Sequence, residues 1–180
     1  VATFKERYFK ETDFQWYKYI YQSAPMYTAD VSVSGGNTGV RYYLSGGALS
    51  QDGLRMGSSY NKVFGRINLD AKLNEWVRAN INTQVSYDAT RVSPFGNNNA
   101  VGGGLAAMNA PFASPYDPNT GKELVRVPLL DIATPSHVIE TNPAKTNNFI
   151  LSTNGNLTIT PLKNLTLRSL IGLELDYGNS

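Results

Sequence analysis

Cysteine is absent from this chain of 180 residues, and histidine occurs only once. The lack of cysteine excludes thiolate metal sites, disulfide bonds and thiol-based catalysis. No stretch approaches the roughly 18 consecutive apolar residues of a membrane-spanning helix. The N-terminal residues also lack the basic and then apolar pattern of a secretion signal. We therefore expect neither a helical membrane protein nor an intact signal peptide here. The net charge of +2 is too small to indicate a nucleic-acid partner.

Six segments of the sequence alternate apolar and polar residues with a period of two, the pattern of a β-strand with two different faces. They cover residues 27–34, 40–48, 63–71, 77–90, 149–159 and 165–177. The apolar positions carry no charge at all, and we call them the charge-free face. They are the odd-numbered residues of five segments and the even-numbered residues of 40–48. The intervening positions, the polar face, hold Asp30, Arg41, Arg66, Asp70, Arg78, Asp88, Arg168, Glu174 and Asp176.

Strand length and connection length favour a membrane barrel over a soluble sandwich, whose inner face is also free of charge. The segments 77–90 and 165–177 alternate for about 13 residues, whereas soluble strands usually run about 3 to 10. Connections alternate between short turns at 36–39, 74–76 and 161–164 and long links at 49–62 and 91–147. Outer-membrane barrels alternate tight periplasmic turns with large extracellular loops in the same way.

The strands divide the chain into four parts. Residues 1–26 form an aromatic-rich segment, 27–90 contain four strands, 91–147 form a long extracellular loop, and 148–180 contain two strands. The loop holds seven of the nine prolines, and prolines interrupt strand ladders. On the charge-free face, aromatic residues lie near strand ends, where rings meet lipid headgroups: Tyr27, Tyr87, Phe149 and Tyr177 near the long links, and Tyr42 near a short turn.

Six strands are too few to close around a polar interior, because even an eight-stranded barrel has room only for its own side chains. Open edges in lipid would leave unpaired backbone groups. We therefore expect an all-β, antiparallel segment of a larger transmembrane barrel, with the polar face lining a wide lumen. The lumen-facing candidates are Arg66, Arg78, Asn80, Asn82, Gln84 and Asp88.

Several short motifs resemble a known family when read in order along the chain. Thr12-Asp13-Phe14-Gln15-Trp16, Ala24-Pro25-Met26 and Val31-Ser32-Val33-Ser34-Gly35-Gly36-Asn37 resemble a passage of SusC/RagA-like TonB-dependent transporters. Further similar stretches are Arg41-Tyr42-Tyr43-Leu44-Ser45-Gly46-Gly47 with Gln51-Asp52-Gly53, then Arg66 to Asn74 with Trp76, Pro115-Tyr116-Asp117-Pro118, Thr146 to Phe149 and Leu157 to Leu165. Each motif alone is weak, but their common order is specific.

The resemblance implies a 22-stranded barrel in the bacterial outer membrane, with an N-terminal plug that contacts TonB. It also implies a SusD-like surface lipoprotein as partner and the import of oligosaccharides or peptides. This chain departs from the family by omission, since it contains no recognisable plug, TonB-contact segment or closing strand. Residues 105–111 correspond to an external-loop helix in the family, although three glycines precede them at 102–104.

Motifs that suggest other chemistry are better explained by local structure. Asp117, Asn119 and Gly121 begin like a calcium loop, but later ligands are missing, so we predict a turn. His137 has no cysteine or metal-spaced carboxylate nearby and is interpreted as a solvated loop residue. The aromatic residues between 14 and 21 suit a sugar-stacking platform, yet packing is the simpler explanation. We expect no enzyme, no cofactor and no metal site.

Two alternatives to a transporter wall stay open at this point. One is a soluble β-sandwich that binds carbohydrate or acts as an adhesin, with the charge-free face as its core. The other is a fragment of a glycoside hydrolase, although no pair of carboxylates stands out.

Overall fold

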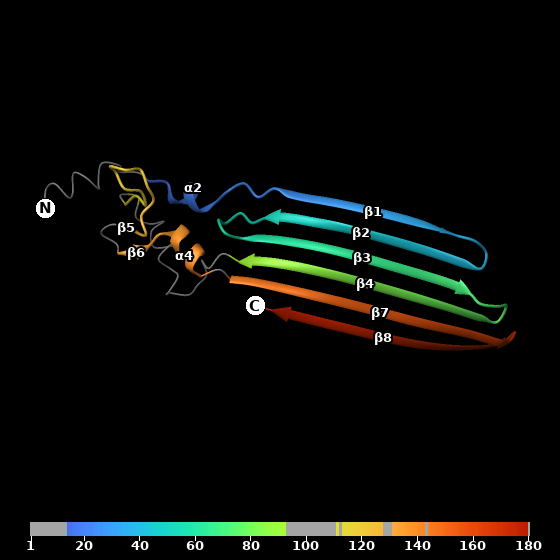
Figure 1. Cartoon of the computed structure of the whole chain (residues 1–180). Coiled ribbons are helices and arrows are strands. Elements are labelled where there is room, and N and C mark those ends of the chain that lie inside the picture. Colours follow the sequence, from blue (N-terminus) through green and yellow to red (C-terminus); the bar gives the residue numbers. More distant parts are fainter. Residues whose placement is uncertain (1–13, 93–110, 112, 128–130, 143, 180) are drawn as a thin grey trace. The chain divides into compact units, whose positions relative to one another are not determined.

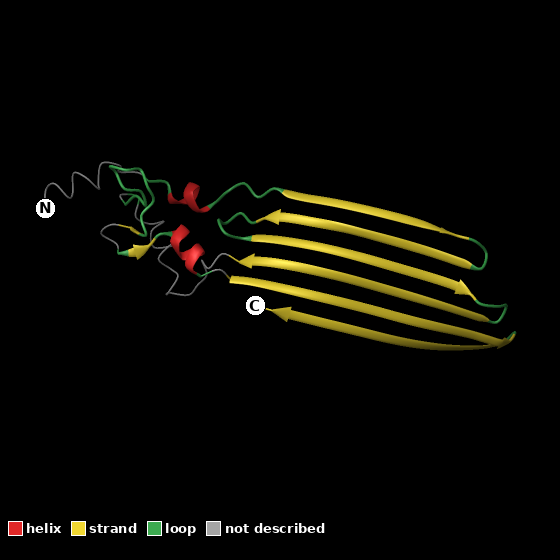
Figure 2. Cartoon of the chain, viewed as in Figure 1, coloured by secondary structure: helices red, strands yellow, loops and turns green. Residues whose placement is uncertain are grey.

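The computed structural model of the chain describes residues 14–92, 111, 113–127, 131–142 and 144–179 (Figure 1). It divides into two compact units. The sheet unit comprises Pro25–Gln51, Tyr60–Thr90 and Thr146–Ser180, and the loop unit comprises Val1–Ala24, Asp52–Ser59 and Arg91–Lys145. Helices occur in the loop unit, whereas the sheet unit consists of strands and turns (Figure 2).

The sheet unit is one six-stranded sheet, in the order β1-β2-β3-β4-β7-β8, with neighbouring strands running in opposite directions (Figure 1). The strands are β1 (Met26–Gly36), β2 (Val40–Asp52), β3 (Ser59–Lys72), β4 (Val77–Val92), β7 (Ala144–Leu162) and β8 (Leu165–Asn179). The predicted all-β fold with six antiparallel strands is therefore confirmed. A sandwich requires a second packed sheet, and the six strands form a single layer.

The register keeps the two predicted faces apart. Val33 pairs with Leu44 and Val31 with Gly46 in the first hairpin, and Thr153 pairs with Leu173 in the last. Each pair joins two positions of the charge-free face, as the hairpin parity predicts. A bulge then shifts the register of the last hairpin between Ile159 and Leu162.

Side-chain hydrogen bonds show that the central strands also place residues of the same predicted face side by side. On the polar face, Arg66 on β3 donates to Gln84 on β4. On the charge-free face, the Thr153 hydroxyl of β7 donates to the Thr83 hydroxyl of β4 at 3.2 Å. All six strands therefore contribute to the same two faces.

Asparagine side chains close two of the tight turns. Asn37 Oδ1 accepts the backbone N–H groups of Gly39 at 2.8 Å and Val40 at 2.9 Å. Asn74 Oδ1 accepts the N–H group of Trp76 at 2.9 Å. Asparagine suits both places because its short side chain hydrogen-bonds the backbone two or three residues ahead. Gly36 precedes the first turn with a φ of +150°, and a Cβ there would collide with the Val40 carbonyl oxygen.

The strands extend beyond the predicted bounds at the ends that meet the longer connections. β2 continues to Asp52 and β3 begins at Ser59, so the predicted long link over 49–62 is wrong, and residues 53–58 alone connect these strands. β2 and β3 are hydrogen-bonded neighbours in the sheet, and near these ends Ser50 Oγ donates to Asn61 Oδ1 at 2.8 Å. Both faces are polar at these ends, so the alternation disappears although the strand persists.

The sheet unit has almost no buried core of its own. Every side chain of β1 and β8 is exposed in the described structure, including Val31 at 74% and Ile171 at 72%. An apolar face of this size is normally covered by something. Among the described residues, no helix is long and apolar enough to cross a membrane.

The loop unit packs around one tryptophan. Trp16 in α2 (Trp16–Ile20) is 1% exposed and clusters with the buried Ala113 and Val127. Phe14 packs edge-on against the Trp16 ring, with a centroid distance of 4.8 Å, and Tyr19 also borders the cluster. The packing interpretation of the aromatic segment is thus confirmed for these residues, whereas Tyr17 remains 53% exposed.

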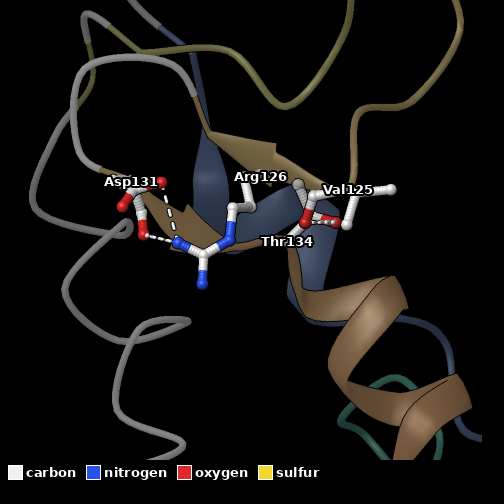
Figure 3. A network of polar contacts seen from close by, with 4 residues as sticks. All are labelled: Val125, Arg126, Asp131 and Thr134. Atoms are coloured by element: carbon white, nitrogen blue, oxygen red, sulfur yellow. Dashed lines mark hydrogen bonds and ion pairs between the residues drawn. The ribbon is translucent and has the colours of Figure 1, made fainter.

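A small hairpin and a second helix complete the loop unit. β5 (Arg126–Val127) pairs with β6 (Ile132–Ala133), and α4 (Pro135–Thr141) follows with proline at its N-terminal turn, where a missing N–H costs nothing. The buried Thr134 hydroxyl donates to the Leu124 carbonyl at 2.7 Å and its N–H to the Val125 carbonyl at 3.0 Å. Figure 3 shows Thr134 beside Val125 and the ion pair that closes the hairpin, from Arg126 to Asp131.

Candidate functional site

The six predicted lumen-facing residues occupy the polar positions of β3 and β4. The structure joins several of them through hydrogen bonds. Arg66 Nη2 donates to Gln84 Oε1 at 3.0 Å, and Asn82 Nδ2 donates to Asn80 Oδ1 at 2.7 Å. Arg78 lies close to the Asn74 turn, near the start of β4, and takes part in neither bond. The polar face is therefore a hydrogen-bonded surface rather than a set of isolated side chains.

Asp88 differs from the other five candidates because it is buried, at 8% exposure, next to the buried Ser86. Its Oδ2 accepts a hydrogen bond from Asn148 Nδ2 on β7 at 3.1 Å. A buried carboxylate needs such partners, since its desolvation would otherwise be costly. Asp88 therefore helps to join β4 to β7.

A groove of about 250 Å³ lies on the polar face around Arg66 and Gln84. The residues that line it come from three neighbouring strands: Arg66, Asn68, Asn82, Thr83, Gln84, Ser152 and Asn154. Sequence reasoning selected Arg66, Asn82 and Gln84 but missed Asn68, Ser152 and Asn154. Alternation does place these three on the polar face. The missing information was that β7 pairs with β4 across the whole intervening loop.

Two hollows lie on the charge-free face. One, of about 340 Å³, is lined by Gly46 and Gly65 and by larger side chains that include Val31, Leu44 and Ile67. The other, of about 400 Å³, includes Ala29, Ala48 and Ala89 together with two aromatic rings, Tyr27 and Tyr87. Both are shallow surface features formed where small residues neighbour large ones.

The motifs that suggested metal chemistry serve local structure. Asp117 Oδ1 accepts the backbone N–H groups of Asn119 at 2.7 Å and Thr120 at 3.2 Å, and Gly121 N donates to the Asp117 carbonyl at 2.8 Å. The predicted turn is confirmed, with Gly121 at a φ of +65°. In the part of the chain that the structure describes, no three His, Cys, Asp or Glu side chains group as metal ligands would.

Two further predictions concern the loop. His137 was expected in a solvated loop but lies half-buried in α4, because Pro135 starts a short helix inside the proline-rich region. The external-loop helix expected over 105–111 falls outside the described residues, apart from Pro111.

Comparison with known proteins gives a consistent result. No family model matches the chain. Over 86 residues it is 31% identical to a TonB-dependent receptor of Formosa agariphila, a match that covers 48% of this chain and 9% of the receptor. Its fold matches the RagAB peptide transporter with a TM-score of 0.78 and 25% identity, over 92% of this chain and 19% of that one. A structure of the RagAB peptide importer in the closed-closed state matches with the same values.

The chain spans less than a fifth of the length of these relatives. Its relatives are outer-membrane receptors and transporters rather than enzymes. The order of the motifs, the single two-faced sheet and the match over 92% of the chain agree with one another. The chain is similar over most of its length to the SusC/RagA-like TonB-dependent transporters of the bacterial outer membrane, and its sheet matches a section of the β-barrel of such a transporter.

Proposed function

We propose that the whole protein imports oligosaccharides or peptides across the outer membrane, driven by TonB, with a SusD-like surface lipoprotein as partner. The observation that carries the proposal is the fold match to RagAB, a peptide importer, over 92% of this chain. The chain's own residues add a wall with one face for lipid and one for a water-filled or plugged lumen.

The charge-free face meets lipid in this proposal. From Val77 to Tyr87 it runs for ten residue steps, which is about 33 Å of strand at about 3.3 Å per residue. A strand tilted by about 40° then crosses about 25 Å, the height of the apolar band of outer-membrane barrels. Phe149 pairs with Tyr177 at the loop end of this band, as expected of an aromatic girdle.

The polar face lines the lumen in this proposal. Arg66, Arg78, Asn80, Asn82, Gln84 and Asp88 all belong to it. Ionisable and amide side chains are costly in lipid and ordinary beside water. Their mutual hydrogen bonds agree with a surface that is solvated or faces another polar protein surface.

The loop between β4 and β7 lies outside the cell in this proposal and contacts substrate or the lipoprotein. Its prolines and turns need hydrogen-bond partners that the hydrocarbon layer does not supply. Its folded part also presents rigid, exposed groups for recognition, such as Tyr116 and Glu123, and loops on a rigid wall commonly carry specificity.

Protease accessibility tests the orientation. Trypsin added to intact cells should cleave after Lys122 or Arg126, while Lys72 and Arg78 beside the Asn74 turn stay protected. The same digestion in a strain without the lipoprotein reveals any shielding by that partner. Cleavage at Lys72 or Arg78 in intact cells, with the loop protected in both strains, would invert the orientation.

Growth tests the transport activity. Deleting the gene should abolish growth on the imported oligosaccharide or peptide mixture as the sole carbon source, and deleting TonB should reproduce that loss. Undiminished growth of the deletion strain on every peptide and oligosaccharide source tested, where no second transporter of this class is encoded, would contradict the proposed function.

A further inference from the structure

Arg66 carries a positive charge that no carboxylate of the described structure neutralises. Its hydrogen bond goes to the neutral amide of Gln84, and the ion pair found among the described residues joins Arg126 to Asp131 instead. A guanidinium group has five N–H donors in a planar fork that matches a carboxylate. One bond to Gln84 leaves most of these donors available to the groove.

Among the described residues, no carboxylate of the polar face forms an ion pair with Arg66. Asp70 lies four residues along β3, about 13 Å from Arg66. Glu174 pairs with Ser152 on β7, so it stands three strand spacings away, about 14 Å. Both separations exceed the screening length of about 8 Å at physiological salt. Asp30 on β1 lies over Gly47 of β2 and forms no ion pair with Arg66, and Asp88 is held by Asn148.

The rest of the groove is built from groups that both donate and accept hydrogen bonds. Amide side chains come from Asn68, Asn82, Gln84 and Asn154, and Ser152 adds a hydroxyl. Such groups match the N–H and C=O edges of a polypeptide. The lining contains no carboxylate that would repel an anion and no aromatic ring against which a sugar would stack.

We propose that this groove binds a carboxylate of a polypeptide, with Arg66 as its charged contact and the surrounding amides holding the neighbouring peptide groups. The inference rests on the proposed function, because it requires the polar face to line the lumen. Two different molecules could supply this carboxylate. It belongs either to an imported peptide or to an acidic side chain of the protein's own polypeptide inside the barrel.

The test uses the full-length transporter in its native outer membrane and two labelled peptides. One peptide contains glutamate and a free C-terminus, and the other has glutamine and an amidated C-terminus in an otherwise identical sequence. Arg66→Gln should lower uptake of the acidic peptide about tenfold relative to the neutral one, since hydrogen bonds to charged groups are the stronger class. Arg66→Lys keeps the charge but loses the fork, and uptake should fall between the two.

A matched control and a second readout separate the two sources. Arg168→Gln removes an arginine from the same face, opposite Thr158 and outside the groove, and should leave the ratio of the two uptakes unchanged. If the carboxylate is the protein's own, Arg66→Gln should reduce both uptakes equally and admit a large hydrophilic antibiotic that the wild type excludes.

The outcomes also distinguish this inference from the proposed function. An Arg66→Gln protein that is abundant in the outer membrane, with unchanged peptide preference and unchanged antibiotic exclusion, would overturn the carboxylate site. A wild-type protein that imports neither peptide would argue against peptide import and against an imported peptide as the source of the carboxylate. Antibiotic exclusion by the Arg66→Gln protein would then decide whether the groove binds a carboxylate of the protein itself.

Discussion

The sheet unit and the loop unit of this chain keep their shape in opposite ways. All side chains of β1 and β8 are exposed, and the sheet relies on its backbone ladder. The loop unit is built from short elements, yet it buries Trp16, Val127 and Thr134 almost completely. A strand wall in a membrane receives its apolar layer from lipid, whereas a unit in water must assemble its own. Substitutions in the loop unit should therefore weaken its own packing, whereas substitutions in the sheet unit should impair assembly in the membrane.

The largest effect should follow from Trp16→Ala in the loop unit. Truncating a buried tryptophan costs about 3–5 kcal/mol, because apolar contacts are lost and a cavity remains. Hydrogen exchange of the purified full-length protein should show that the Val127 and Thr134 amides lose protection while those of β7 and β8 keep theirs. Tyr17→Ala, one residue away but 53% exposed, is the matched control and should change little. Equal loss of protection in the sheet would mean that the two units fold as one.

A charge on the charge-free face should be the next most damaging change. Ile81→Arg places arginine near the middle of the proposed lipid band, at a cost of about 2–4 kcal/mol. Asn82→Arg introduces arginine at the adjacent position, which lies on the polar face, and should have only a mild effect on assembly. The amount of folded barrel in the outer membrane, measured by heat-modifiable gel mobility, compares the two. Leu173→Arg should repeat the effect on β8, and equal assembly of all three variants would show that the faces are assigned wrongly.

A smaller effect should come from the buried hydroxyl of the loop unit. Thr134→Val leaves the Leu124 carbonyl without its 2.7 Å partner, at a cost of about 1–3 kcal/mol. Thr141→Val also removes a 2.7 Å bond, to the His137 carbonyl, but at an exposed position where water replaces it. The trypsin cleavage rate after Arg126 should rise in the first variant only. Identical rates would show that the Thr134 bond contributes nothing to the loop unit.

The smallest effect should come from the exposed ion pair of Arg126 and Asp131. Their side chains are 57% and 85% exposed, and such pairs contribute about 0–1 kcal/mol. Asp131 also has a φ of +52°, which glycine adopts without strain. Asp131→Ala should therefore destabilise the hairpin slightly more than Asp131→Gly, as read from hydrogen exchange at Thr134. Both variants lack the ion pair, so the opposite order would mean that the extra freedom of glycine in the unfolded chain outweighs the backbone strain of alanine at this φ.

Sequence alone predicted the sheet well because its two faces differ so strongly in charge and polarity. Alternation in β4 from Val77 to Ala89 reports directly which side chains meet each face, and the hairpin register follows from it. The same logic fails where both faces are polar, as at Gln51 and Asn61, and there the strands were predicted too short.

The loop unit could not be predicted in the same way. Trp16 meets Ala113 and Val127, which lie about a hundred residues further along the chain, and no local pattern connects them. α4 was hidden by the prolines around it, although Pro135 in fact begins the helix. In the groove, Arg66 and Gln84 were found by alternation within neighbouring strands, but Ser152 required the pairing of β4 with β7.

The hydroxyl pair of Thr83 and Thr153 has a consequence for how relatives of this chain diverge. The two side chains hydrogen-bond each other on the face assigned to lipid, where a lone hydroxyl has no water to turn to. Replacing one threonine by valine leaves the hydroxyl of the other without a hydrogen-bond partner, whereas replacing both makes the surface uniformly apolar. Across related transporters, the two positions should therefore change together, although 70 residues separate them in the gene's reading order. In an alignment of related transporters, neither position would be invariant by itself. The constraint would appear only in which pairs of residues occupy the two positions.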